Sequence, residues 1–148
     1  MNIREYQAQD LESLAELMGD LGYPTHSMRM KHRMDNIQSD PMCFTFLAEM
    51  DGNIVGMVGV RKTFLYEVDD VATQITVIVT KEGYRNKGIG TALIKFVEEW
   101  AEREGTKVIV LTSGIKAERL KAHELYKTAG FDITGYRFVK KLLKDSSE

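Results

Sequence analysis

Hydrophobic residues recur along this chain at two spacings that alternate from one segment to the next. A spacing of about 3.6 residues predicts amphipathic helices, and alternating or continuous apolar runs predict strands. The strands are expected over 2–6, 43–50, 54–66, 71–80, 107–112 and within 131–143, and the helices over 10–21, 30–37, between 91 and 105, and over 116–129. The resulting order, βααβββαβαβ(β), is typical of an α/β (α+β) domain.

A cationic, glycine-rich turn lies between the predicted strand 71–80 and the helix that follows it. Its sequence is Tyr84-Arg85-Asn86-Lys87-Gly88-Ile89-Gly90-Thr91. The first amides of a helix have no internal partner and carry the positive end of the helix dipole, so they can donate to phosphate oxygens where glycines let the backbone approach. The turn is therefore a predicted phosphate site, although a glycine-rich turn with solvated Arg85 and Lys87 can also serve only as a tight connection.

Two better-known phosphate-binding loops do not fit this turn. A P-loop places lysine directly after its second glycine, where this chain has Ile89, so magnesium-assisted nucleotide hydrolysis loses its main support. A dinucleotide-binding fingerprint would need a third glycine at position 93, where Leu93 stands.

The remaining pattern, Arg-x-x-Gly-x-Gly at residues 85–90, resembles a signature of the GNAT acetyltransferases. The segment Ala122–Phe131 is similar to the family's second signature, Ala-x-x-(Phe or Leu)-Tyr-x-x-x-Gly-Phe, and the two occur in family order. The resemblance is good from Asp51 to Phe131 and is limited to the order of elements in the first fifty residues. It implies one GNAT domain over 1–148, whose mixed central sheet has six to seven strands, is splayed around strands four and five, and is flanked by about four helices.

The resemblance also implies acetyl-coenzyme A as the donor, an amine as the acceptor, and direct attack of the amine in a ternary complex. Spacing alone places Tyr126 on the apolar stripe of its helix, but it matches the family position whose hydroxyl points at the coenzyme sulfur. A phenol of pKa about 10 is a suitable proton donor to a departing thiolate of pKa about 8.5. The residues implied to bind the coenzyme through backbone groups or charge are Ile78, Val79, Thr80, Arg85, Asn86, Lys87, Gly88, Gly90, Thr91 and Arg119.

Two residues depart from the family pattern. Thr76 stands where many relatives have the glutamate that takes the proton from the acceptor amine, and threonine cannot be that base. Either the proton leaves through water to an acidic group, or the acceptor amine binds already neutral. The candidate acidic groups are Glu67, Asp69 and Asp70. Arg119 stands where the second signature often begins with asparagine, and it either reaches coenzyme oxygens or faces solvent.

Composition and charge narrow the function classes further. With 148 residues, 43% hydrophobic and 28% charged, the chain is expected to form one globular domain. The single cysteine, Cys43, cannot form an internal disulfide, and the chain shows neither a signal peptide nor an apolar run of about 18 residues, so we expect a cytoplasmic protein. A net charge of −2 argues against a dedicated nucleic-acid binder. No metal-ligand spacing or serine nucleophile elbow is present.

The acceptor amine is left open by the sequence. A small metabolite amine, an aminoglycoside-like molecule, an amino-acid derivative and a protein N-terminus or lysine are all candidates, with a small molecule favoured because one short domain carries no added recognition module. Alternatives are an acetyl-CoA sensor without transfer activity and an acyltransferase for longer chains. His26, His32, Tyr23, Tyr66 and Tyr136 fall where an acceptor pocket could form. A homodimer is possible through a closing strand at 131–143.

Overall fold

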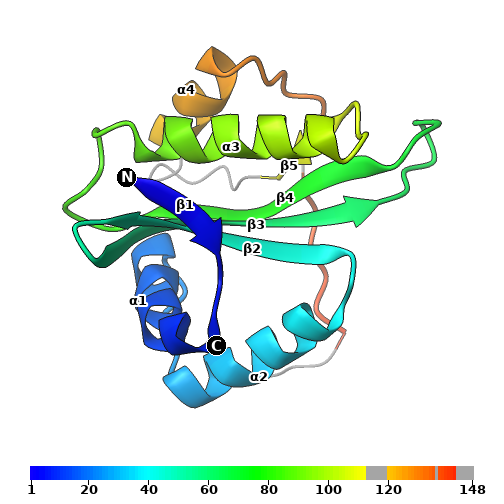
Figure 1. Ribbon diagram of the computed structural model, residues 1–148. Helices are drawn as coiled ribbons and strands as arrows, with labels where there is room; N and C mark the ends of the chain where they lie inside the picture. The colour runs from blue at the N-terminus through cyan, green and yellow to red at the C-terminus, as the bar shows by residue number, and fades with distance from the viewer. Residues whose placement is uncertain (113–119, 136, 143–148) are drawn as a thin grey trace.

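The computed structural model describes residues 1–112, 120–135 and 137–142, with the side chains of 120 and 121 left out (Figure 1). Its elements are β1 (Asn2–Glu5), the 3₁₀ turn η1 (Ala8–Asp10), α1 (Leu11–Leu21), α2 (Ser27–Ser39), β2 (Cys43–Met50), β3 (Asn53–Thr63), β4 (Ala72–Thr80), α3 (Ile89–Arg103), β5 (Ile109–Leu111) and α4 (Leu120–Thr128). The order agrees with the predicted order as far as the last helix.

The strands form one mixed sheet in the order β1-β2-β3-β4-β5. The first four strands pair antiparallel, and β5 pairs parallel to β4. Asp51 and Gly52 connect β2 to β3 with φ of 52° and 79°, the left-handed conformations that a tight hairpin turn requires. Figure 1 shows α1 and α2 on one face of the sheet and α3 and α4 on the other.

A hydrophobic core lies on each face of the sheet. The core under α3 contains Leu93, Val97 and Trp100, and the ring of Trp100 lies 5.0 Å from that of Phe44, centroid to centroid. The core under α1 and α2 includes Leu14, Leu17, Met30, Met34, Leu47, Met57 and Val79. Burying each large apolar side chain contributes about 1.5–3 kcal/mol, so these stripes fix which side of each helix faces the sheet.

The prediction of a closing strand within 131–143 is wrong for the residues that the structure describes there. The sheet of the described chain has five strands instead of six to seven, and residues 131–135 and 137–142 have no regular secondary structure. β5 extends only over Ile109–Leu111, shorter than the predicted 107–112, so it offers a very short edge for another strand. The apolar side chains that suggested the strand are exposed instead, among them Ile133, Phe138, Val139 and Leu142.

The sheet opens between β4 and β5. β4 pairs with β5 only at Thr73, Gln74 and Ile75, but it pairs with β3 as far as Thr80. The register between β3 and β4 shifts after Gly59, because Gly59 pairs with Val77 while Val60 pairs with Ile75, so Thr76 is the extra residue of a β-bulge. The second half of β4 therefore extends past the described end of β5.

Candidate active site

The glycine-rich turn presents backbone donors on an open surface. Gly83, Asn86 and Gly88 adopt left-handed φ of 90°, 63° and 80°. Gly88 is the N-cap of α3, and its carbonyl accepts the first bond of the helix from the amide of Ala92 at 3.0 Å. The amides of residues 89–91 precede that bond, and a β-carbon on Gly88 would meet no atom within 4 Å. This geometry suits an anion bound at the start of α3.

The two cations of the turn also contact the protein. The Arg85 guanidinium donates to the backbone carbonyl of Asp20 at 3.2 Å, near the C-terminal end of α1 where the helix dipole is negative. The Lys87 ammonium lies 5.2 Å from the ring centroid of Tyr84. Arg85 thus connects the turn to α1, a contact that the sequence did not indicate, and the side chains of Arg85 and Lys87 are both exposed beside the turn.

Gly90 brings the two sequence signatures together. A β-carbon built on Gly90 would lie 2.8 Å from Cδ2 of Leu125 in α4, so only glycine fits there without moving the leucine. The next residue along α4 is Tyr126. Packing of α4 against the start of α3 therefore positions the tyrosine relative to the turn.

The end of β4 has backbone groups that none of the described strands pairs with. The amide of Lys81 donates to the carbonyl of Val55 at 2.8 Å, and the carbonyl of Val79 lies close to Gly56, so both groups face β3. Because backbone polar groups alternate along a strand, those of Ile78 and Thr80 face the opposite edge, beyond the part that pairs with β5. This edge can bond an extended ligand.

Two cavities meet at Tyr126. The first, here called the α2 cavity, has a volume of about 930 Å³ and lies between α1, α2 and the sheet. The second, here called the β5 cavity, has a volume of about 1060 Å³ and is bounded by β5 and α4. Tyr126, Leu111 and Thr112 line both cavities. The half-buried Tyr126 ring packs edge-on against Phe131 with 6.3 Å between centroids, which limits how the ring can turn.

Thr76 and Ile78 of β4 also line the α2 cavity. Thr76 is exposed and lies at the bulge, and its Oγ1 lies 3.1 Å from the position of a β-carbon on Gly59. Thr76 and Tyr126 therefore bound the same space, from β4 and from α4.

The acidic groups considered as proton acceptors lie outside the α2 cavity. Glu67 lines only the β5 cavity, Asp69 lines neither, and the Asp70 carboxylate pairs with Lys107 at 3.5 Å. Among the described residues, the lining of the α2 cavity contains no carboxylate at all. The cavity in which an amine could approach Tyr126 thus has no carboxylate base in its described wall.

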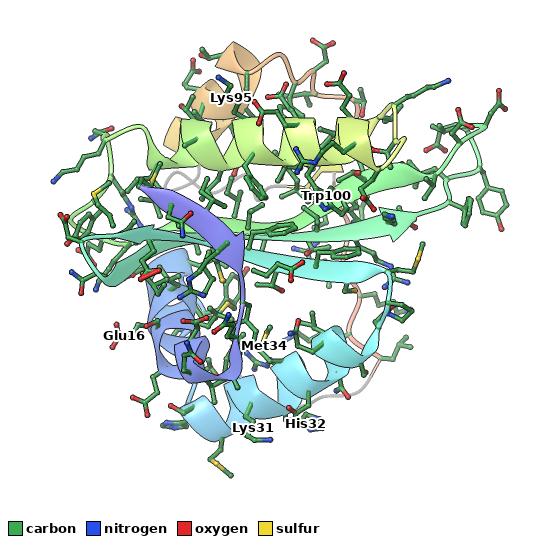
Figure 2. All side chains as sticks on the ribbon, viewed as in Figure 1. Glu16, Lys31, His32, Met34, Lys95 and Trp100 are labelled. Carbon is green, nitrogen blue, oxygen red and sulfur yellow. The ribbon has the colours of Figure 1, made fainter. Side chains whose placement is uncertain are left out.

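Of the other aromatic and imidazole candidates that the structure describes, only Tyr23 lines the α2 cavity. His26 and His32 are exposed and line neither cavity, and Figure 2 shows His32 on the side of α2 that faces away from the sheet. Tyr66 is fully exposed. Arg119 and Tyr136 lie outside the described residues.

Sequence analysis missed two arginines of the α2 cavity, Arg33 and Arg137. Arg33 is three residues after Met30 and directly before Met34, both of which are buried against the sheet. Helical spacing could therefore have placed Arg33 at the border of the buried face. Arg137 lies within 131–143, the segment that was expected to form a closing strand, and that expectation gave no reason to place it at this cavity.

Near this cavity, Arg61 joins two polar groups. Its Nη1 donates to Oδ2 of Asp40 at 2.6 Å and lies 3.3 Å from Sγ of Cys43. A hydrogen bond from the amide of Met42, together with the one from Arg61, holds the pKa of Asp40 below its usual value. Asp40 therefore remains charged as the counter-ion of Arg61.

Within residues 1–112, 120–135 and 137–142, no helix is both long enough and apolar enough to cross a membrane. Within those residues, no three His, Cys, Asp or Glu side chains are grouped so that they could hold a metal ion.

Several known proteins are similar to this chain in sequence or in structure. Aminoalkylphosphonate N-acetyltransferase of Salmonella typhimurium is 30% identical over 103 residues, covering 70% of this chain and 66% of the relative. N-acetylaspartate synthetase of Homo sapiens is 36% identical over 89 residues, covering 60% of this chain and 27% of the relative. The crystal structure of a GNAT family acetyltransferase from Staphylococcus aureus matches with a TM-score of 0.81 at 29% identity, covering 95% of this chain and 98% of that one.

The chain thus spans just under two thirds of the first curated relative and about a quarter of the second. The profile of the acetyltransferase (GNAT) family matches residues 9–131, which include the helices under the α2 cavity, the turn and Tyr126. Because this match covers most of the chain, the chain belongs to the GNAT family of acetyltransferases.

Proposed function

We propose that this chain transfers the acetyl group of acetyl-CoA to the amine of a small molecule, with both substrates bound at once. The observation that carries the proposal is the position of Tyr126, which lines both cavities and shares one of them with Thr76 and Ile78 of β4. The size of the α2 cavity supports a small acceptor, since ligand sites commonly measure about 300–1000 Å³.

The turn would hold the coenzyme by its phosphates. The amides of residues 86–91 donate to the pyrophosphate, and Arg85 and Lys87 add positive charge beside it. The exposed backbone of Ile78 and Thr80 bonds the pantetheine arm, and Val79 fixes the strand against β3. Arg119, by resemblance, contributes a further cation. The coenzyme supplies a thioester, which is an acyl group on a good leaving group.

Tyr126 acts as the general acid. Its hydroxyl donates a proton to the sulfur as the carbon–sulfur bond breaks, which avoids releasing a free thiolate. The backbone amides of Ile78 and Thr80 polarise the carbonyl, because they face away from β3 on the edge beyond the residues that pair with β5. Packing against Phe131 and the contact between Leu125 and Gly90 hold the phenol in place.

The amine loses its proton without help from a side-chain base. Thr76 occupies the place of the usual glutamate, and the described wall of the α2 cavity carries no carboxylate. The acceptor therefore binds as the neutral amine or passes its proton to water. This feature is also the observation that favours the second candidate, a sensor that binds acetyl-CoA without transferring the acetyl group.

The donor site is tested by calorimetric titration with acetyl-CoA. The test variant is Gly88→Asp, which places a carboxylate at the start of α3, and the matched control is Gly52→Asp. Both glycines have φ near 80° and no atom within 4 Å of a β-carbon, so the backbone strain is similar. We expect binding to be lost in Gly88→Asp and kept in Gly52→Asp.

Transfer itself is tested by following thiol release with a panel of primary amines. Release with small amines supports the proposal, and release only with peptides points to a protein acetyltransferase. Binding without release for any amine supports the sensor. Absence of binding by the unaltered chain would overturn both.

A further inference from the structure

We infer that the acceptor amine carries an apolar body, an alkyl or arylalkyl group, which occupies the α2 cavity between the two helices and the sheet. The inference rests on the proposed function, since it specifies the molecule that enters the acceptor side of the same site. It is carried by the side chains of the cavity wall, many of which belong to the hydrophobic core under α1 and α2.

The wall of the α2 cavity includes side chains from the interior of that core. Leu14 of α1, Met30 and Met34 of α2 and Met57 of β3 all line the cavity, and each is at most 5% exposed. Figure 2 shows Met34 pointing from α2 toward the sheet. The cavity is therefore an opening within the packing of the two helices on the sheet, and a molecule bound there contacts core side chains.

Other apolar side chains of the same core are only half-buried. Met18 and Leu21 of α1, Ile37 of α2 and Val77 of β4 pack against the buried residues and also line the α2 cavity. Each keeps apolar surface in contact with solvent, and a ligand in the cavity would cover part of it. Because removing apolar surface from water is favourable, an apolar body on the acceptor would complete the core at this point.

Polar side chains are a minority in this wall. Thr76 and Tyr126 lie where acetyl transfer is proposed to take place. Arg33 and Arg137 have apolar stems, and an arginine can cover apolar surface with its stem while its guanidinium group stays solvated or paired. The other lining residues with a hydroxyl or thiol group are Tyr23, Cys43, Thr45 and Thr112. A hydroxyl or a charge on the body of the acceptor would lose hydrogen bonds to water on entering the apolar part of the cavity.

Methionines make the wall adaptable. Four of the eight methionines of the chain line the α2 cavity, and they come from α1, α2 and β3. The unbranched thioether adopts several shapes and makes favourable contacts with aromatic rings. A wall of this kind selects an apolar class of ligand more strongly than one exact shape. Alkyl and arylalkyl amines are therefore both expected to be acceptors.

The test compares linear primary amines of similar length that differ at the far end. The probes are hexylamine, 5-aminopentanol, cadaverine and δ-aminovalerate, which end in a methyl, hydroxyl, ammonium and carboxylate group, each assayed by thiol release at saturating acetyl-CoA. We expect kcat/KM for hexylamine to exceed that for each polar amine by at least about tenfold. A value for any polar amine that is within about threefold of hexylamine, or above it, would overturn the inference and leave the proposed function intact.

Variants assign the effect to the cavity wall. Met18→Gln and Ile37→Gln each place an amide in the wall, from α1 and from α2. Each should lower kcat/KM for hexylamine by about tenfold while 5-aminopentanol is affected less, so that the preference for the apolar amine falls. The control is Met28→Gln, because Met28 is 79% exposed and lines neither cavity. A preference that survives in both wall variants, with acetyl-CoA still bound, would contradict the assignment.

Binding without turnover separates this inference from the proposed function. The protein saturated with coenzyme A is titrated with the N-acetyl derivatives of hexylamine and of 5-aminopentanol, which are both uncharged. Binding of the hexyl compound that is tighter by about tenfold, and weakened in Met18→Gln or Ile37→Gln, supports the apolar site even if no amine is acetylated. Equal affinity, or no binding of either compound, overturns the inference whether or not transfer occurs.

Discussion

A β-carbon on Gly90 would lie 2.8 Å from Cδ2 of Leu125, so the second residue of α3 lies directly beneath α4. The contact joins the glycine-rich turn to the helix that carries Tyr126. Gly90 therefore has a packing role as well as its proposed place beside the coenzyme phosphates. Since the atom it would meet is the end of a flexible leucine, the contact can be tested by substitution.

Substitutions at Gly90 and Leu125 should be strongly coupled. Gly90→Ala overpacks the contact at a cost of about 1–3 kcal/mol, partly offset by about 1 kcal/mol of helix propensity. In a Leu125→Ala background the crowding is gone, so Gly90→Ala should be neutral or stabilising. Urea denaturation of the four proteins measures the coupling free energy, for which we expect about 1–3 kcal/mol.

The control for this cycle is Gly19→Ala in α1. A β-carbon there meets no atom within 4 Å, so this substitution should stabilise the chain by up to about 1 kcal/mol in either background. Additivity of Gly90→Ala and Leu125→Ala to within about 0.5 kcal/mol would show that the two residues do not press on one another.

Tyr126→Phe should slow acetyl transfer while leaving the fold and coenzyme binding unchanged. Loss of a positioned proton donor typically lowers the rate by about 10²–10⁴-fold, and the phenylalanine ring preserves the packing against Phe131. The measurements are kcat from thiol release and the affinity for acetyl-CoA from calorimetry. Tyr66→Phe is the control, because Tyr66 is fully exposed and lines neither cavity. A turnover number that is unchanged in Tyr126→Phe would remove the phenol from the mechanism.

Thr76→Glu should give the site a general base. The threonine is exposed to the α2 cavity at the β4 bulge, so a longer acidic side chain has room to extend there. With ethanolamine as acceptor, we expect kcat/KM of the unaltered chain to rise with pH as the amine deprotonates. Near pH 7, kcat/KM of Thr76→Glu should exceed that of the unaltered chain by about tenfold or more. The measurement is the pH profile of kcat/KM.

Thr76→Gln provides the matched control for this change, since it has the same length without the charge. If Thr76→Glu and Thr76→Gln show the same pH profile, the carboxylate does not take the proton.

Asp10 should make a large contribution to stability. Its carboxylate is 4% exposed and accepts two bonds from Arg4, at 2.8 and 2.9 Å, and one from the amide of Gln7 at 2.8 Å. Arg4 is 25% exposed and also pairs with Glu49, so the loss is that of hydrogen bonds to a charged group, and Asp10→Asn should lower the free energy of unfolding by about 1.5–3 kcal/mol. Asp35→Asn, which disrupts the exposed pair with Lys31, should cost at most about 0.5 kcal/mol.

The same carboxylate should make stability depend on pH. The hydrogen bond from Arg4 is the main cause that lowers the pKa of Asp10, and burial opposes it. Its contribution is present above the unfolded pKa of about 4 and is lost as the pH falls through the lower folded value. Urea denaturation between pH 6 and pH 3 should therefore show a smaller loss of stability in Asp10→Asn. An equal loss of stability in the unaltered chain and in Asp10→Asn would mean that other carboxylates cause the pH dependence.

Local patterns in the sequence predicted much of this molecule because their physical causes are local. The apolar stripes of α1 and α3, the left-handed hairpin turn at Asp51 and Gly52, and the turn that opens α3 all depend on residues within a few positions of one another. The order of elements and the mixed sheet follow from these patterns and the family resemblance, and the profile match confirms the family.

Tertiary structure decided the features that depend on distant segments. The pattern within 131–143 alternates as a strand does, but β5 is three residues long and provides little backbone to pair with. Arg85 bonds to Asp20, Leu125 covers Gly90, and Arg33 faces the same cavity as Arg137, which lies more than a hundred residues later. Periodicity determines which face of an element is buried, whereas only packing determines which elements that face meets. The glycine-rich turn at the start of α3 could therefore be predicted, and the residues that meet around the α2 cavity could not.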